Sequence, residues 1–119
     1  MPSYIKDYKS GQKIYEWDGK CLKAYSGGQK RFEWDGRYIK LQQDGHKAFE
    51  FDGQYFKTYS DGKKIYEVTC SYIKQYGGGN KLFEIDGKYL KRYSDGSKTL
   101  EIDGIIPIAV LITVATGLI

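Results

Sequence analysis

The sequence contains few of the side chains from which enzyme active sites are usually built. His46 is its only histidine, and Cys21 and Cys70 are its only cysteines. A histidine-based metal site needs several such ligands, and an activated nucleophile needs a base beside it. His46 falls in a predicted turn, far around the fold from both cysteines. The sequence therefore predicts a non-enzymatic protein with no cofactor and no metal.

Six lysines that recur every 17 residues are the main candidate for an anion-binding site. If the fold gathers them at one end, they form a basic rim that attracts anionic phospholipid headgroups or an acidic partner. Nucleic acid is not expected. The alternative is that the rim only offsets the terminal carboxylate and keeps the protein monomeric. These lysines are Lys13, Lys30, Lys47, Lys64, Lys81 and Lys98.

Tyrosines form a second candidate site. Twelve are present, and ten are predicted to lie on the charged face of a sheet. A surface lined with tyrosine rings can stack on sugars or form a protein interface. The alternative is that the rings only pack on the stems of neighbouring lysines. The most regularly placed tyrosines are Tyr38, Tyr55, Tyr72 and Tyr89.

A 17-residue internal repeat determines where the candidate lysines and the candidate tyrosines lie. Its frame is Lys13-Ile14-Tyr15-Glu16-Trp17-Asp18-Gly19, and related segments follow through to residue 104. Asp-Gly between short aromatic and β-branched runs is a strong β-hairpin signal. Only Thr69-Cys70 departs from the Asp-Gly turn, which indicates either a special site or relaxed selection. The six copies predict an all-β fold built from six hairpins.

The pattern predicts twelve strands in an antiparallel up-and-down barrel. The first and last strands are the two halves of one hairpin unit, so their pairing would close the sheet and remove both edges. An open single-layer sheet is the alternative. The predicted ranges are 3–9, 13–17, 20–26, 30–34, 37–42, 47–51, 54–60, 64–68, 71–77, 81–85, 88–94 and 98–102.

The odd repeat length constrains the turns. A two-residue Asp18-Gly19 turn would pair Trp17 with Lys20, and a three-residue loop such as 60–62 would then pair Leu22 with Phe32. This register puts the aromatic and aliphatic residues on one face. Glutamates occupy the other face beside a row of lysines, which we call the outer-row lysines and expect to pair with those glutamates. The outer-row lysines are Lys6, Lys23, Lys40, Lys57, Lys74 and Lys91.

Residues 105–119 form an uncharged apolar segment after the repeats. Its length is below the roughly 17–25 residues that a membrane-spanning helix needs. A helix from Pro107, threaded through the barrel, would bury the segment and fill the core. A strand or a short membrane anchor is the alternative. We therefore expect a single domain over 1–119, with the repeat barrel in 1–104 and a core helix in 105–119.

This architecture is similar to that of the tubby C-terminal domain and its relatives, the phospholipid scramblases and LURP-one-related proteins. The run Phe83-Glu84-Ile85-Asp86-Gly87-Lys88-Tyr89-Leu90 resembles the strand style of the LURP-one-like group. The resemblance covers the whole chain and rests on architecture, and no lipid-headgroup motif carries over. It implies a non-enzymatic binding or scaffold domain at membrane lipid.

Charge is unevenly distributed along the strands. The net charge is +4, but the end that carries the longer loops collects +12 and the end that carries the Asp-Gly turns collects −8. We call these the loop end and the turn end. This charge layout favours a monomer. The presence of only two cysteines and the absence of a secretory signal favour a cytoplasmic location, which would be peripheral at a membrane if the protein binds lipid. A carbohydrate or protein ligand on the tyrosine face is the alternative function.

Overall fold

The Asp-Gly segments form tight turns because the aspartate side chain satisfies the backbone. In the computed structural model, which describes residues 3–41 and 45–116, Asp52 Oδ1 accepts the N–H of Gln54 at 3.0 Å and that of Tyr55 at 2.8 Å. Asp18 and Asp35 accept the equivalent bonds. Such side-chain turns favour aspartate at this position. They start the second strand of these three hairpins.

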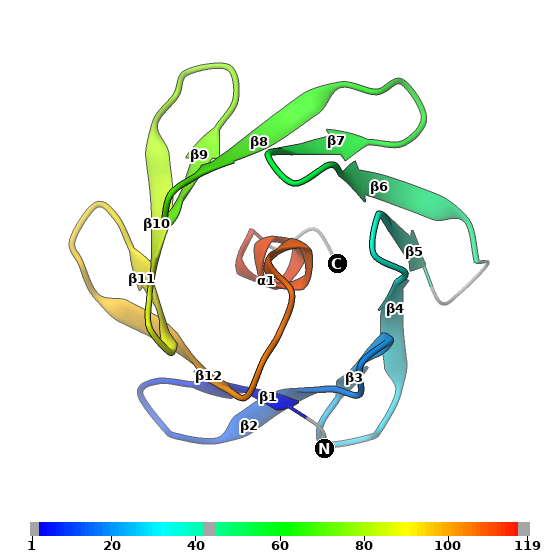
Figure 1. Cartoon of the computed structure of the whole chain (residues 1–119). Coiled ribbons are helices and arrows are strands. Elements are labelled where there is room, and N and C mark those ends of the chain that lie inside the picture. Colours follow the sequence, from blue (N-terminus) through cyan, green and yellow to red (C-terminus); the bar gives the residue numbers. More distant parts are fainter. Residues whose placement is uncertain (1–2, 42–44, 117–119) are drawn as a thin grey trace.

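Twelve antiparallel strands close into a barrel in which β1 pairs with β12, as predicted (Figure 1). Closure leaves neither end of the sheet unpaired. The strands are β1 (Ser3–Asp7), β2 (Lys13–Trp17), β3 (Cys21–Ala24), β4 (Lys30–Trp34), β5 (Tyr38–Leu41), β6 (Lys47–Phe51), β7 (Tyr55–Thr58), β8 (Lys64–Thr69), β9 (Tyr72–Gln75), β10 (Lys81–Asp86), β11 (Tyr89–Arg92) and β12 (Lys98–Asp103).

The register across the Asp-Gly turns differs from the prediction by two residues. Trp17 lies opposite Leu22, not Lys20, because Asp18 and Cys21 still bond across the turn. A two-residue shift leaves every side chain on its predicted face, since side chains alternate with period two. The hydrophobic face therefore stays the core face.

The longer loops also differ from the prediction. Thr58 bonds with Lys63 across a four-residue loop, and Gly62 closes it with a positive φ of 69°. The repeat has an odd number of residues, so one residue in each repeat must lie outside the strand pairing. That residue is Ile65, which forms a β-bulge opposite the register shift between Phe56 and Lys57. A bulge adds one residue to one strand and increases the local twist. The predicted pair of Leu22 with Phe32 is confirmed.

The C-terminal segment contains the helix α1 (Ile108–Ala115), preceded by Pro107 as predicted. Figure 1 shows α1 at the centre of the ring of strands, seen nearly end-on. Val110 and Ile112 are fully buried and belong to the same core as the inward-facing Phe32 and Phe56. The predicted passage through the whole barrel extends to 117–119, outside the described residues. Among the described residues, no helix has the length and apolarity to cross a bilayer.

The seam between β12 and β1 is closed by a specific contact. The buried Ser3 hydroxyl accepts the N–H of Ile105 at 3.1 Å. A Cβ on Gly104 would collide with the Ser3 side chain, whose own Cβ would lie only 2.7 Å away. Gly104 also has a φ of +113°, which side-chain-bearing residues rarely adopt. Glycine is therefore required where the chain leaves the wall for the core.

Candidate functional site

The barrel wall brings one lysine and two tyrosines together from three successive strands or their ends. Lys64 on β8 extends its Nζ to 4.1 Å from the ring centroid of Tyr55 on β7. The same Nζ is 5.5 Å from the ring of Tyr76, which follows β9. The two rings meet edge to face, with centroids 5.7 Å apart and planes at 84°. Both contacts are within the range of cation–π and aromatic attraction.

We call this arrangement the Lys–Tyr–Tyr cluster, and five copies occur around the wall. In each copy the lysine lies 4.0–4.2 Å from the ring of the first tyrosine. The clusters are Tyr4–Lys13–Tyr25, Tyr38–Lys47–Tyr59, Tyr55–Lys64–Tyr76, Tyr72–Lys81–Tyr93 and Tyr89–Lys98–Tyr8. The structure thus joins the two candidate sets that the sequence analysis treated separately.

The bulge helps to place the second tyrosine. The N–H of Tyr76 donates to the carbonyl of Ile65, the bulge residue, at 3.1 Å. Tyr25, Tyr59 and Tyr93 bond in the same way to the bulges of their own neighbouring strands. The second tyrosine of each cluster is 43–47% exposed. These rings therefore offer accessible aromatic surface beside a lysine.

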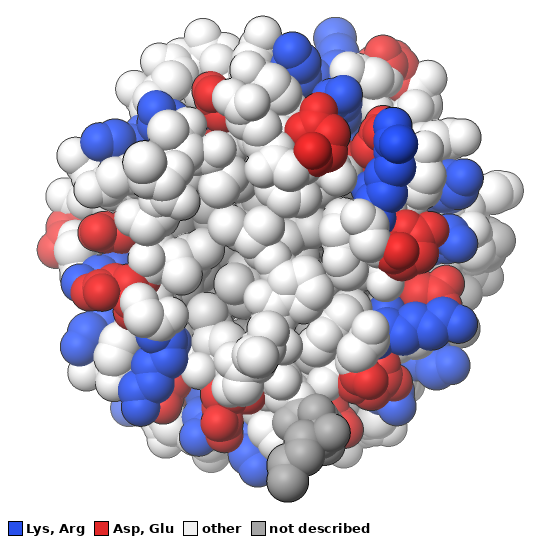
Figure 2. All heavy atoms as spheres, viewed as in Figure 1, with Lys and Arg blue, Asp and Glu red and all other residues white. Residues whose placement is uncertain are grey.

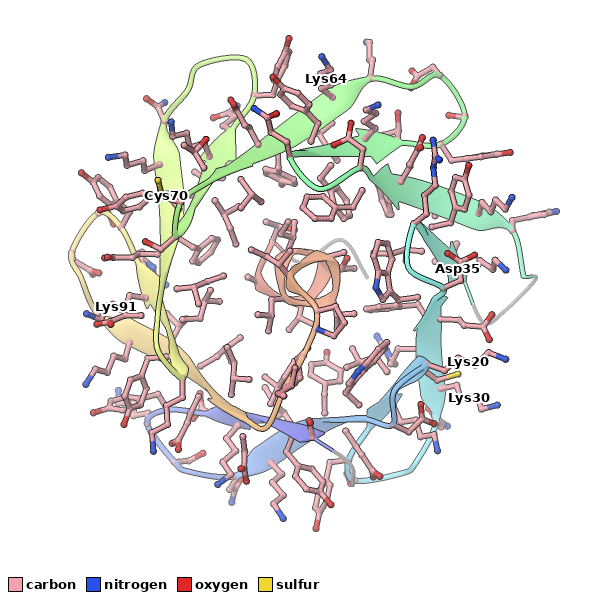
Figure 3. The ribbon with its side chains drawn as sticks, viewed as in Figure 1. Lys20, Lys30, Asp35, Lys64, Cys70 and Lys91 are labelled. Atoms are coloured by element: carbon pink, nitrogen blue, oxygen red, sulfur yellow. The ribbon has the colours of Figure 1, made fainter. Side chains whose placement is uncertain are left out.

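Lys30 is the exception among the six candidate lysines. The buried Cys21 occupies the position of the first tyrosine, and Gln42, at the position of the second, lies outside the described residues. Figure 3 shows Lys30 and Lys64 on the outside of the wall, well separated around it. Lys30 therefore provides an internal comparison: the same residue type at the same repeat position, without the two rings.

The outer-row lysines have a different environment from the cluster lysines. Lys57 Nζ lies 3.2 Å from Asp52 Oδ2, so the predicted pairing with glutamate is wrong for this row. The glutamates instead bond to the turn residues, as in Arg37 Nε to Glu50 Oε2 at 2.7 Å. The other four ion pairs of the outer row are Lys6–Asp103, Lys23–Asp18, Lys40–Asp35 and Lys91–Asp86.

These ion pairs reduce the predicted separation of charge. Each joins a lysine assigned to the loop end with an aspartate assigned to the turn end, because a lysine stem reaches across the pleat. Figure 2, viewed as Figure 1 from the end where the chain leads from β12 into α1, shows basic and acidic residues alternating around an uncharged centre. Within residues 3–41 and 45–116, the cluster lysines and Lys30 form no ion pair.

The lysines also do not project from the rim as predicted. Lys13 lies opposite Lys6, whereas its partner ring Tyr4 lies two residues nearer the turn end on β1. Lys13 therefore directs its ammonium group back along the wall. The second tyrosine of each cluster was predicted to lie on the charged face, but its contact with the lysine and the first tyrosine was not predicted. The signal was a tyrosine followed by lysine at +9 and tyrosine at +21, as in Tyr55, Lys64 and Tyr76.

Turn carboxylates are held in their charged form. The pKa of Asp52 is lowered from 3.8 to about 2, chiefly by the N–H of Tyr55 and also by the N–H of Gln54 and by Lys57. The N–H of Tyr38 is the first cause of a lowered pKa for Asp35. Hydrogen bonds to a carboxylate favour its ionised state. These aspartates therefore neutralise the outer-row lysines at neutral pH.

The broken turn keeps the strand pairing despite the change of sequence, with a backbone close to that of the turn at Gly87 (φ 61°) and unlike that at Gly53 (φ 105°). Thr69 still pairs with Tyr72, and Cys70 takes the glycine position with a φ of 56°. Cys70 is exposed, and the part of the chain that the structure describes contains no group of three or more histidine, cysteine or acidic residues able to hold a metal ion. No contact at this turn points to a ligand.

Comparison with known proteins gives no relative. No protein-family model, no curated protein and no solved structure matches this chain. The architectural similarity to the tubby, scramblase and LURP-one-related proteins therefore stays an expectation.

Proposed function

We propose that this protein is a non-enzymatic binding module whose Lys–Tyr–Tyr clusters hold an anionic ligand against the outer wall. One observation carries the proposal: the barrel repeats the same cluster five times, each with an accessible ring and a lysine that no described carboxylate neutralises. Five of the six outer-row lysines, in contrast, are neutralised by aspartates, and the exception within the described residues is Lys74, beside the turn in which Thr69 replaces aspartate. The cluster lysines are therefore available to an external anion, and each lies beside an accessible tyrosine ring.

An acidic polysaccharide suits the clusters best. A sugar ring can pack on an exposed tyrosine such as Tyr76, while its carboxylate or sulfate accepts hydrogen bonds from Lys64. The clusters lie around the circumference, and a flexible chain can follow the wall from one to the next. Binding at several linked sites strengthens the whole interaction without new contacts.

Phospholipid headgroups are the second candidate, because a phosphate presents the same charge to the lysines. A flat bilayer reaches fewer clusters than a flexible polymer, since the clusters follow one another around a closed ring of strands. The geometry therefore favours the polysaccharide over the lipid expected from the sequence.

Two matched variants test the proposal. The cluster variant changes Lys13, Lys47, Lys64, Lys81 and Lys98 to Gln, and the control changes Lys6, Lys23, Lys40, Lys57 and Lys91 to Gln. Both lose the same charge. Calorimetric titration with heparin should show at least a tenfold loss of affinity in the cluster variant and a smaller loss in the control.

The same proteins are titrated with neutral dextran and pelleted with phosphatidylserine vesicles. Binding to the vesicles and not to heparin would move the assignment to lipid. Equal losses of heparin binding in the two variants would show that only overall charge matters, and no binding to any of the three would reject the proposal.

A further inference from the structure

Ile105 is an apolar residue at a polar position of the repeat. Its side chain is 88% exposed, the largest exposure among the described large hydrophobic residues. The equivalent positions carry Lys20, Arg37, Gln54 and Lys88. A single exposed isoleucine is common on protein surfaces, so its surroundings decide whether it has a role.

Ile105 borders a hollow on the turn end of the barrel. The hollow has a volume of about 540 Å³ and is lined by Tyr4, Trp17 and the two turns Asp18-Gly19 and Asp103-Gly104. Figure 2 shows that this end has an uncharged centre. A protruding apolar residue and a hollow partly lined by aromatic side chains therefore lie next to each other on the same face.

The rim around this face is suited to contact with a copy of itself. Lys20, Arg37 and Lys88 are 58–72% exposed, and Asp86 and Asp103 are 58% and 53% exposed. Figure 2 shows the two signs alternating around the rim. When two such rims face each other, a rotation can place basic residues of one against acidic residues of the other.

We infer that two copies of this chain associate through their turn ends, with each Ile105 seated in the Trp17 hollow of the other copy. A twofold axis makes both contacts at once, because the protruding residue and the hollow are neighbours. The whole chain extends over 37 and 34 Å along its two longer axes, which sets an upper limit of about 1,000 Å² on the end face, compared with the roughly 800 Å² per partner of a standard interface.

This inference is independent of the proposed ligand, because the Lys–Tyr–Tyr clusters lie on the outer wall. It departs from the monomer expected from the charge count. That expectation assumed an unbalanced acidic end, whereas five outer-row lysines reach across to the turn aspartates and reduce its negative charge. A bilayer fits the face less well, because five turn aspartates would meet the headgroups.

Sedimentation velocity of the full chain from about 1 to 100 µM tests the inference. The wild type should shift from 13.7 kDa to twice that mass as concentration rises. Ile105→Glu should raise the dimer dissociation constant at least about tenfold, because its carboxylate would lie among Asp18 and Asp103 of the other copy. Ile14→Glu is the matched control at the loop end, where Ile14 is 37% exposed, and should dimerise like the wild type.

A crosslinking experiment supplies a second readout. In a Cys70→Ser background, Ile105→Cys should form a disulfide-linked dimer under mild oxidation, and Ile14→Cys should not. A wild type that stays at 13.7 kDa throughout overturns the inference, as does equal dimerisation of the two glutamate variants. Binding of the wild type, but not of Ile105→Glu, to phosphatidylcholine vesicles would assign the face to a bilayer instead.

Discussion

At the scale of single residues, the repeat shows which positions are constrained by their surroundings. Gly53 and Gly104 occupy equivalent turns with similar φ values of 105° and 113°. A Cβ on Gly53 would meet nothing within 4 Å, whereas one on Gly104 would collide with Ser3. Gly53 is therefore required for its backbone conformation, whereas Gly104 is required both for its backbone conformation and for its packing against Ser3.

Replacing these two glycines by alanine should have unequal effects. Gly53→Ala should lower the free energy of unfolding by about 1–2 kcal/mol, the cost of the backbone conformation. Gly104→Ala should lower it by about 3 kcal/mol or more, because Ser3 is also displaced and its bond to Ile105 is lost. Urea denaturation measures both. Equal losses would mean that the seam tolerates a side chain.

At the scale of elements, the hairpins depend on charged turns and the barrel depends on its central helix. The carboxylates of Asp35 and Asp52 bond to backbone N–H groups that start β5 and β7. Ile112 of α1 is fully buried against the wall. The turn bonds thus stabilise the start of a strand through neighbouring residues, whereas α1 stabilises the wall through contacts between residues far apart in the sequence.

Acid should weaken the turns in a defined window. A lowered pKa in the folded state means that the carboxylate stabilises the fold above its ordinary pKa and stops doing so as pH falls through the folded value. For Asp52 the window runs from 3.8 down to about 2. We expect the Tm to fall less between pH 5 and pH 2 in Asp35→Asn/Asp52→Asn than in the wild type.

The side-chain oxygen of asparagine can still accept the two backbone hydrogen bonds of the turn, but it does not titrate. The variant therefore differs from the wild type mainly in the ionisation of these side chains. The difference should persist in 0.5 M salt, because backbone hydrogen bonds are the first cause of the pKa shifts of Asp35 and Asp52. Parallel acid curves for the variant and the wild type would contradict this account.

Truncating the helix should destabilise the whole barrel. Ile112→Ala removes fully buried methylene and methyl groups and should lower the free energy of unfolding by about 2–5 kcal/mol. Ile14→Ala, at an exposed bulge position of β2, should lower it by less than about 1 kcal/mol. Similar values in urea denaturation would show that α1 does not support the core.

At the scale of the whole molecule, closure turns a linear repeat into a ring of equivalent sites with one gap. Tyr8, which follows β1, completes the cluster of Tyr89 and Lys98, which lie near the other end of the chain. The gap lies at Lys30, where Cys21 replaces the first tyrosine. The ring therefore depends on the pairing of β1 with β12.

The gap can be filled by design. Cys21→Tyr/Gln42→Tyr restores around Lys30 the sequence pattern of the other copies, a tyrosine, a lysine at +9 and a tyrosine at +21. We expect the free energy of unfolding to rise by about 0.5–1.5 kcal/mol from one aromatic pair and one cation–π contact, and the affinity for heparin to increase. Cys21→Tyr alone is the control and should show less of both effects. An unchanged affinity in the double variant would mean that the clusters are structural only.

Several features of this protein were predictable from the sequence because they are local or periodic. The Asp-Gly turns, the twelve strands, their faces and the helix after Pro107 follow from turn chemistry and from the alternation of side chains. Pairing of β1 with β12 followed from the repeat itself, because its first and last strands are halves of one unit.

Only the tertiary structure decided the register and the side-chain partners. The repeat length requires one odd residue, which either a loop or a bulge could supply. The structure has a bulge at Ile65, opposite the step from Phe56 to Lys57, and a bulge increases the local twist of the wall. Long lysine side chains choose partners by reach and not by register, so Lys57 lies opposite Glu50 yet binds Asp52. The Lys–Tyr–Tyr clusters exist because the closed, twisted wall brings three strands within the reach of one ammonium group.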